Sequence, residues 1–223
     1  MASHLDLEEQ EQLDQVKAFW REYGNLVTWL LVIALGAYAA WNGWNWYQRD
    51  QATKAGAMYD ELDAAAQAGD ADRANRVFTD LKSRYPGTAF AEQGGLVAAR
   101  VLFEKGQADA ARAALGWVAE NAAETEYRTI ARLRLAGLLL DAKKDAEALK
   151  ELEGADAKPF AALVDDRRGD ILLAQGKKDE ARAAYLRAWQ AMDPKLDYRR
   201  LVEAKLNVLG TDPGASPASG AAR

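Results

Sequence analysis

The chain has 223 residues, a formal net charge of −5 and no cysteine. This composition excludes a disulfide framework and thiol chemistry, and the acidic balance leaves no basic stripe of the kind that binds nucleic acid. With abundant alanine and only 5 prolines, a chain of this length favours one helical domain with a core of its own.

The first 24 residues form an acidic leader, with six acidic and only two basic side chains. Apolar side chains recur in it at helical spacing: Leu13, Val16, Phe19 or Trp20, and Tyr23. We predict a short amphipathic helix over residues 1–24. Two interpretations stay open, a solvated leader and a docking helix for a partner.

Residues 25–47 are predicted to form a transmembrane helix. The stretch from Leu26 to Trp46 holds no charged residue, and as a helix it would span about 31 Å, close to the thickness of a bilayer's hydrocarbon core. Aromatic side chains gather at both ends, where the headgroup layer favours them: Trp20, Tyr23 and Trp29, then Trp41, Trp44, Trp46 and Tyr47. Membrane lipid is therefore an expected partner.

A cleaved signal peptide is the alternative interpretation of the same stretch. Ala37, Tyr38 and Ala39 fit the small-x-small pattern of a cleavage site. The acidic leader and the apolar run that continues to Trp46 favour an uncleaved anchor instead.

One face of this helix is predicted to contact another membrane helix. Gly36, Ala40 and Gly43 are spaced by four and three residues, so they share a face on which two helices can approach closely. Chance alignment is the alternative, because alanine and glycine are common in this chain.

The rest of the chain repeats. Alanine recurs at positions 74, 111, 148 and 181, with periods of 37, 37 and 33 residues. This spacing resembles the tetratricopeptide repeat, a helix-turn-helix unit of about 34 residues that stacks into a solenoid. Two positions depart from that pattern, Leu62 in place of a small residue and Lys143 in place of a turn glycine. The long periods predict longer links between repeats.

We predict an all-α fold, a single N-terminal transmembrane helix followed by a tetratricopeptide-like solenoid. Residues 48–210 form the repeat domain and residues 211–223 a disordered tail rich in small residues and proline. A last helix, Tyr198 to Leu209, is expected to cap the array. The expected core residues are Leu96, Leu102, Leu115, Leu133, Leu139, Leu149, Leu152, Leu172 and Tyr185.

Catalytic chemistry is not expected. The only histidine is His4, and the repeat domain holds a single serine, Ser83, so no Ser-His arrangement can form there. Asp166 and Asp170 lie one helical turn apart and could serve acid-base chemistry or a metal, but a local ion-pair cluster explains them better. We expect no enzyme activity, no cofactor and no metal.

A partner-binding groove is expected instead, because the first helix of each tetratricopeptide pair lines the concave face. By repeat register the groove residues are Gln93, Leu96, Arg100, Phe103, Ile130, Leu133, Gly137, Leu163, Asp166 and Asp170. At the positions where relatives clamp a terminal carboxylate, only Arg100 could serve, so such a clamp is not supported. The groove suits a partner helix or an extended apolar segment; alternatively, Leu96 and Leu133 belong to the core.

The order of parts resembles the bacterial YfgM-like family, an ancillary subunit of the Sec translocon. The likeness rests on AFWREYGN before the span, WNWYQ after it, and the repeats GLVAARVLFEKGQADAARAAL, ARLRLAGLLL and DRRGDILLAQGKKDEARAAY. It implies a protein of the bacterial inner membrane with a cytoplasmic N-terminus and periplasmic repeats. Implied partners are the Sec channel and a membrane-anchored chaperone of the peptidyl-prolyl isomerase type, to which newly translocated proteins are passed. The family has no known catalytic residues.

The charges beside the span do not decide its orientation. Lys17 and Arg21 before it are matched by Arg49 and Lys54 after it, a tie under the positive-inside rule. Two functions therefore stay open, a periplasmic adaptor at the Sec translocon and a membrane-anchored scaffold for an envelope assembly or signalling complex.

Overall fold

The computed structural model describes residues 7–214, with side chains from residue 11. Over this range every regular element is helical, which confirms the all-α prediction. The chain divides into two compact units, one ending at Gln51 and the next beginning at Ala52. The start of the predicted leader and most of the predicted disordered tail, residues 1–6 and 215–223, lie outside the described residues.

The first unit is helical and exposes its apolar side chains. Helix α1 (Leu7–Gln67) contains the predicted span, and it is the one described helix long and apolar enough to cross a membrane. Ile33, Leu35 and Trp41 are each more than 60% exposed. Thr28 donates its hydroxyl to the Gly24 carbonyl at 2.7 Å, so the one polar side chain between Leu26 and Trp41 is satisfied inside the helix. A surface this apolar fits lipid.

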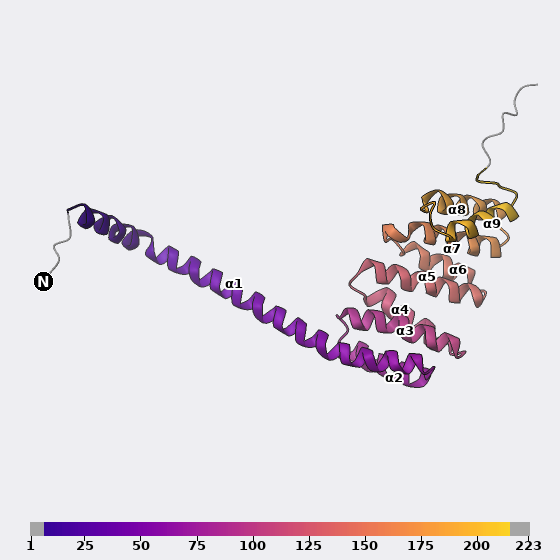
Figure 1. Cartoon of the computed structure of the whole chain (residues 1–223), viewed down its shortest axis with the longest axis horizontal. Coiled ribbons are helices and arrows are strands. Elements are labelled where there is room, and N and C mark those ends of the chain that lie inside the picture. The colour runs from indigo at the N-terminus through magenta and orange to yellow at the C-terminus, as the bar shows by residue number, and fades with distance from the viewer. Residues whose placement is uncertain (1–6, 215–223) are drawn as a thin grey trace, which may run out of the picture. The chain divides into compact units, whose positions relative to one another are not determined.

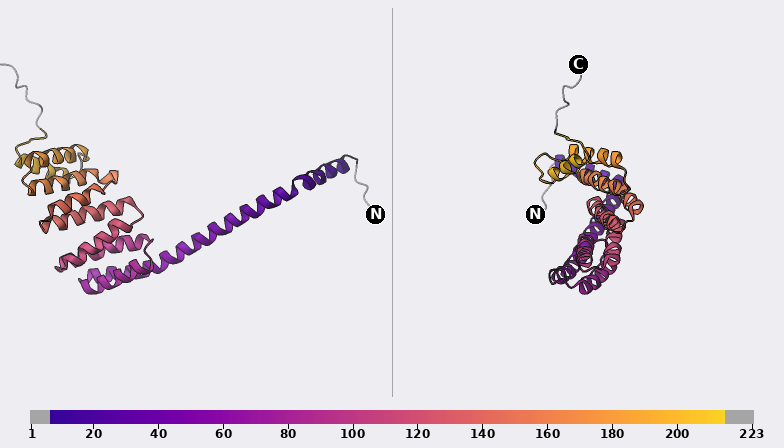
Figure 2. Two further views of the ribbon diagram at one scale, coloured as in Figure 1. Left: turned by 180° about the vertical axis from the view of Figure 1, so that it is seen from behind. Right: turned by 90° about the vertical axis from the view of Figure 1, so that its right-hand side faces the viewer.

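The second unit stacks helices in antiparallel pairs, in chain order along the array (Figures 1 and 2). The part of α1 after Gln51 pairs with α2. The remaining elements are α2 (Ala71–Arg84), α3 (Ala89–Glu104), α4 (Ala108–Asn121), α5 (Thr125–Asp141), α6 (Asp145–Glu153), the 3₁₀ turn η1 (Lys158–Phe160), α7 (Ala161–Ala174), α8 (Lys178–Ala191) and α9 (Tyr198–Val208).

The same turn closes each first helix. The turn residues have a positive φ and are Gly69, Gly106, Lys143, Gly176 and Gly210. The amide of each following residue donates back to the preceding helix, as from Gln107 to Leu102 at 2.8 Å and from Lys144 to Leu139 at 2.8 Å. These bonds satisfy carbonyls that the helix end leaves free. Lys143 therefore takes a glycine's place and conformation.

Small residues let the paired helices cross closely, as the repeat pattern predicts. The recurring alanines are all fully buried: Ala74, Ala111, Ala148 and Ala181. Leu62 is also fully buried and faces Gly94, where a Cβ would lie only 2.9 Å from Leu81 Cδ2. A Cβ on Gly169 would stand 2.5 Å from the Tyr185 ring. These glycines thus set the spacing between helices.

Most of the expected core is buried: Leu96, Leu102, Leu115, Leu139, Leu152, Leu172 and Tyr185. Leu133 and Leu149 are only partly buried and pack against it. In the last helix Val202 and Leu206 are fully buried against α8, whereas Leu201 is 48% exposed.

The prediction of longer links in the 37-residue periods is wrong. Residues 85–88 and 122–124 suffice to join the pairs there, and the added length lies in the helices. Helices α3 and α5 have 16 and 17 residues against 14 in α7, and α2 and α4 have 14 each against 9 in α6. The shorter period contains the longest link, residues 154–160, because α6 has only 9 residues.

Candidate partner-binding groove

Two adjoining hollows lie along the first helices of the second, third and fourth pairs. The first has a volume of about 430 Å³ and is lined by Ala99, Arg100, Phe103, Leu115, Arg134, Gly137, Leu138, Asp141 and Arg167. The second has a volume of about 530 Å³ and is lined by Ile130, Leu133, Arg134, Phe160, Leu163, Asp166, Arg167, Leu196 and Tyr198. Arg134 and Arg167 line both, so we treat the two hollows as one groove.

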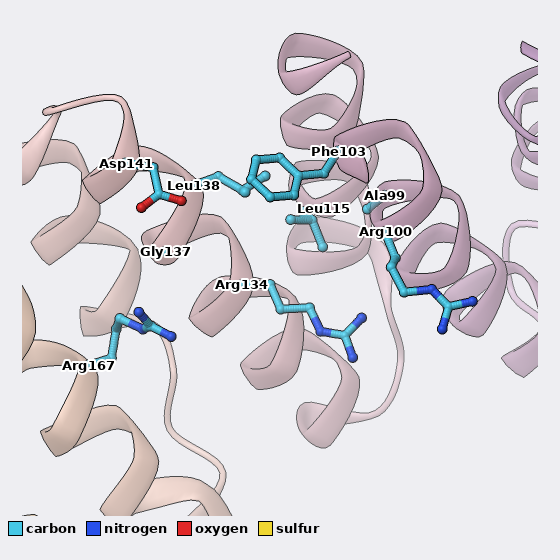
Figure 3. Close-up of a pocket in the computed structure, with 9 residues that line it drawn as sticks. All are labelled: Ala99, Arg100, Phe103, Leu115, Arg134, Gly137, Leu138, Asp141 and Arg167. Carbon is cyan, nitrogen blue, oxygen red and sulfur yellow. The ribbon is translucent and has the colours of Figure 1, made fainter. Parts of the chain in front are cut away.

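Three arginines stand in the groove, one each from α3, α5 and α7 (Figure 3). Arg134 and Arg167 hold the same repeat position, nine residues before the turn residues Lys143 and Gly176. The repeat therefore places successive guanidinium groups along one face. Beside them Phe103, Leu115 and Leu138 form an apolar wall.

Two of these arginines have no carboxylate partner within the described chain. Arg134 donates to the Leu96 carbonyl at 3.3 Å, and neither Arg100 nor Arg134 makes an ion pair with any side chain described between residues 11 and 214. Burial, and the charge of Arg100, lower the pKa of Arg134 below its ordinary value. Arg167 is paired with Asp170 at 3.7 Å. The centre of the groove thus carries positive charge that the chain itself does not neutralise.

Asp166 and Asp170 belong to a cluster that ties three helices together. Lys205 of α9 reaches Asp166 at 2.8 Å and Asp170 at 2.7 Å. The Tyr198 hydroxyl donates to Asp166 at 2.7 Å, and the Tyr185 hydroxyl donates to Asp170 at 2.8 Å. The structure therefore gives both carboxylates partners inside the chain.

The two tyrosines act as permanent donors in this cluster. Burial raises the pKa of Tyr185 far above its ordinary value, and the hydrogen bond to Asp170 raises it further. Burial and Asp166 do the same for Tyr198. Among the described residues, no group of His, Cys, Asp or Glu has an arrangement that could hold a metal ion.

The other residues expected in the groove separate into lining and supporting positions. Arg100, Phe103, Ile130 and Leu133 line it, and Asp166 reaches its edge. The expected neighbours Gly137 and Leu163 line it as well. Leu96 is only 8% exposed and lies in the core. Gln93 donates to the Tyr127 hydroxyl at 2.7 Å, which joins α3 to α5.

The residues expected to form the membrane-helix contact lie on an open face of the first unit. Gly36, Ala40 and Gly43 are exposed, and a Cβ on either glycine would meet nothing within 4 Å.

Sequence reasoning missed several lining residues: Arg134, Leu138, Phe160, Arg167, Leu196 and Tyr198. Arg134 and Arg167 carried a usable signal, because they share one repeat position. Phe160 and Leu196 lie in the irregular segments before α7 and before α9, which follow no repeat register.

The sequence is similar to those of known proteins. Residues 17–211 match the family model of a tetratricopeptide repeat-like domain. An ancillary SecYEG translocon subunit of Neisseria gonorrhoeae is 31% identical over 213 residues, which cover 94% of this chain and 100% of the relative. Proteins of the same name are 29% identical in Escherichia coli, over 79% of this chain and 85% of the relative, and 28% identical in Haemophilus influenzae, over 91% and 98%.

The family model covers the repeats together with the apolar stretch before them, and the alignment with the Neisseria relative extends over nearly the whole chain. The chain belongs to the tetratricopeptide repeat-like, YfgM-like family of ancillary SecYEG translocon subunits.

Proposed function

We propose that this chain is a non-enzymatic, membrane-anchored adaptor at the Sec translocon. The observation that carries the proposal is the full-length likeness to relatives named ancillary SecYEG translocon subunits, together with a repeat array that holds an open groove. In this role the array helps to pass newly translocated proteins to periplasmic chaperones. A membrane-anchored chaperone of the peptidyl-prolyl isomerase type is the proposed partner.

The proposed arrangement is a single pass through the bacterial inner membrane. Residues 1–24 are the cytoplasmic leader, residues 25–47 cross the membrane, residues 48–210 are the periplasmic repeats and residues 211–223 the tail. The short leader and the family likeness support this orientation, because the flanking charges are balanced.

The two units are proposed to serve different partners. The face of Gly36, Ala40 and Gly43 contacts the Sec channel, because helices in lipid associate mainly through close packing at small residues. The groove on the repeats contacts the chaperone partner. Each of the two contacts can therefore be tested with a variant in its own unit.

Topology is tested first. A reporter that is active only in the periplasm, fused after Gly210, is expected to be active. If a cytoplasm-only reporter is active there instead, the adaptor role fails and the scaffold for a cytoplasmic complex takes its place.

Copurification in mild detergent then tests the division of roles. Leucine at positions 36, 40 and 43 is expected to reduce recovery of the Sec channel while leaving the chaperone partner bound. Ala34→Leu is the matched control, since it enlarges a small residue on another face of the helix. Arg100→Glu with Leu133→Ser is expected to do the reverse. Loss of the channel with the groove variant alone would contradict the assignment.

A further inference from the structure

Apolar and charged side chains follow one another along the groove, and their order determines which kind of ligand fits it. Phe103, 45% exposed, belongs to its first apolar part. Leu163, 37% exposed, and Leu196, 53% exposed, belong to its second. Arg134 and Arg167 line both parts, so cations separate two apolar surfaces. The apolar side chains of both parts are therefore only partly covered by the chain itself.

The groove carries more positive than negative charge. The first part holds three arginines and one carboxylate, Asp141. Arg167 is paired with Asp170, whereas Arg100 and Arg134 have no carboxylate in ion-pair range among the side chains of residues 11–214. The chain as a whole carries a net charge of −5. The local excess of positive charge in the groove is therefore opposite in sign to the net charge of the whole chain.

Arginine side chains beside apolar walls favour one class of ligand. A guanidinium group holds a carboxylate with two parallel hydrogen bonds, and these bonds are stronger where water is partly excluded. The buried part of Arg134 costs desolvation that an incoming carboxylate would offset. An apolar peptide without a carboxylate would leave that cost in place.

We propose that the groove binds an extended segment of a partner polypeptide in which apolar side chains flank an aspartate or glutamate. The apolar side chains occupy the two hollows, and the carboxylate is bound between Arg100 and Arg134. The inference rests on the proposed function only in that the repeats bind a protein. It differs from a terminal-carboxylate clamp, because the acidic group is a side chain within the segment.

Selection from a display library of random short peptides, with both peptide ends blocked from the groove by flanking sequence, tests the proposal. The full chain in detergent is the target. Enriched peptides are expected to contain acidic residues flanked by apolar ones. Resynthesised peptides with asparagine or glutamine in place of the acidic residue are expected to bind with an affinity that is lower by about tenfold or more. Enrichment of purely apolar or basic peptides, or no enrichment, would overturn the proposal.

Variants of the chain distinguish binding by the groove arginines from nonspecific attraction to positive charge elsewhere on the surface. Arg100→Gln with Arg134→Gln is expected to abolish the enrichment, whereas Arg84→Gln with Arg200→Gln removes the same charge at exposed positions outside the groove and is expected to preserve it. A circular dichroism melt confirms that both variants are folded. Equal loss in both, or retention in the groove variant, contradicts the assignment.

Two other outcomes are informative. Self-association that disappears in the groove variant, measured by light scattering, would identify a second copy as the occupant and overturn the proposal. Copurification with the Sec channel is a separate measurement on the membrane unit. The proposed function can therefore fail while the peptide result stands, and the reverse also holds.

Discussion

At the scale of single residues, Lys143 shows how far a repeat tolerates an exception. Its φ of 58° lies in the left-handed region, where the other repeat turns have glycine. A side chain there costs about 1 kcal/mol relative to glycine. The residue is exposed.

We therefore expect Lys143→Gly to raise the free energy of unfolding by about 1 kcal/mol. Ala142→Gly is the control, because Ala142 has a φ of −80° and glycine there only adds freedom to the unfolded chain, at a loss of about 0.5–1 kcal/mol. Urea unfolding of both variants measures the difference. Two changes of the same sign would mean that the turn is not under this constraint.

Glu92 is a second exception, a carboxylate only 2% exposed in the core of α3. One oxygen accepts from the Ala123 amide at 2.8 Å, and the other has no hydrogen-bond partner in the described part of the chain. Burial raises the pKa of Glu92 above its ordinary value; Glu124 raises it further, while the Ala123 amide and Arg128 oppose the shift.

A raised pKa in the folded state fixes the sign of the pH dependence. The contribution of Glu92 to stability is fully present below its unfolded pKa and is lost as pH rises through the folded pKa. Glu92→Gln keeps the acceptor for Ala123 and removes the buried charge, so we expect a variant more stable than the original chain at neutral pH. Urea unfolding across a pH series measures this. An advantage that shrinks as pH rises would contradict it.

At the scale of the element, α9 is held by charge as well as by apolar packing. Val202 and Leu206 are buried against α8, and Lys205 bridges Asp166 and Asp170 of α7. Without Lys205, two carboxylates one turn apart would face each other with little solvent around Asp166.

We expect Lys205→Met to lower stability by about 2 kcal/mol and to increase amide hydrogen exchange in α9 before the other helices. Lys195→Met, in the exposed link before α9, removes the same charge and should leave exchange unchanged. If α9 stays protected in the first variant, the apolar contacts alone hold the helix.

The pairing of the helices shows what the sequence could and could not predict. The small residues Ala111, Ala148 and Ala181 fixed the register of the pairs, because close helix crossings admit few alternatives. Lys205 could be placed on a capping helix, but its partners lie 35 and 39 residues away. That pairing depends on how α9 packs on α7, which no local pattern determines.

The groove was predictable to a similar degree. Repeat position identified Arg100, Phe103 and Leu133 as facing residues. It left Leu96 open between the groove and the core, because neighbouring positions on one helix face differ in burial by small rotations, and the structure places Leu96 in the core. Phe160 and Leu196 come from irregular segments whose paths are set by tertiary packing.

At the scale of the whole molecule, the exposed apolar surface of the first unit fits a helix that crosses a membrane. If the span is an uncleaved anchor, the intact mass of the protein extracted from membranes should include residues 1–39. The acidic leader argues against processing, because signal peptides begin with positive charge. A mature N-terminus at Ala40 would contradict the anchor and remove the proposed contact with the channel.

The capping helix α9 affects whether copies of the molecule can stack end to end. Glu203 stands seven residues before Gly210, where Ala99, Ala136 and Gly169 stand before their own turns. A solenoid that ended on a small residue there would offer its last face to the next copy, and head-to-tail growth into filaments would follow. A charged side chain at that position opposes such stacking, because a copy packed against it would bury the carboxylate. We expect Glu203→Ala to gain concentration-dependent mass in sedimentation experiments, so that one carboxylate acts as the terminator of an otherwise open polymer.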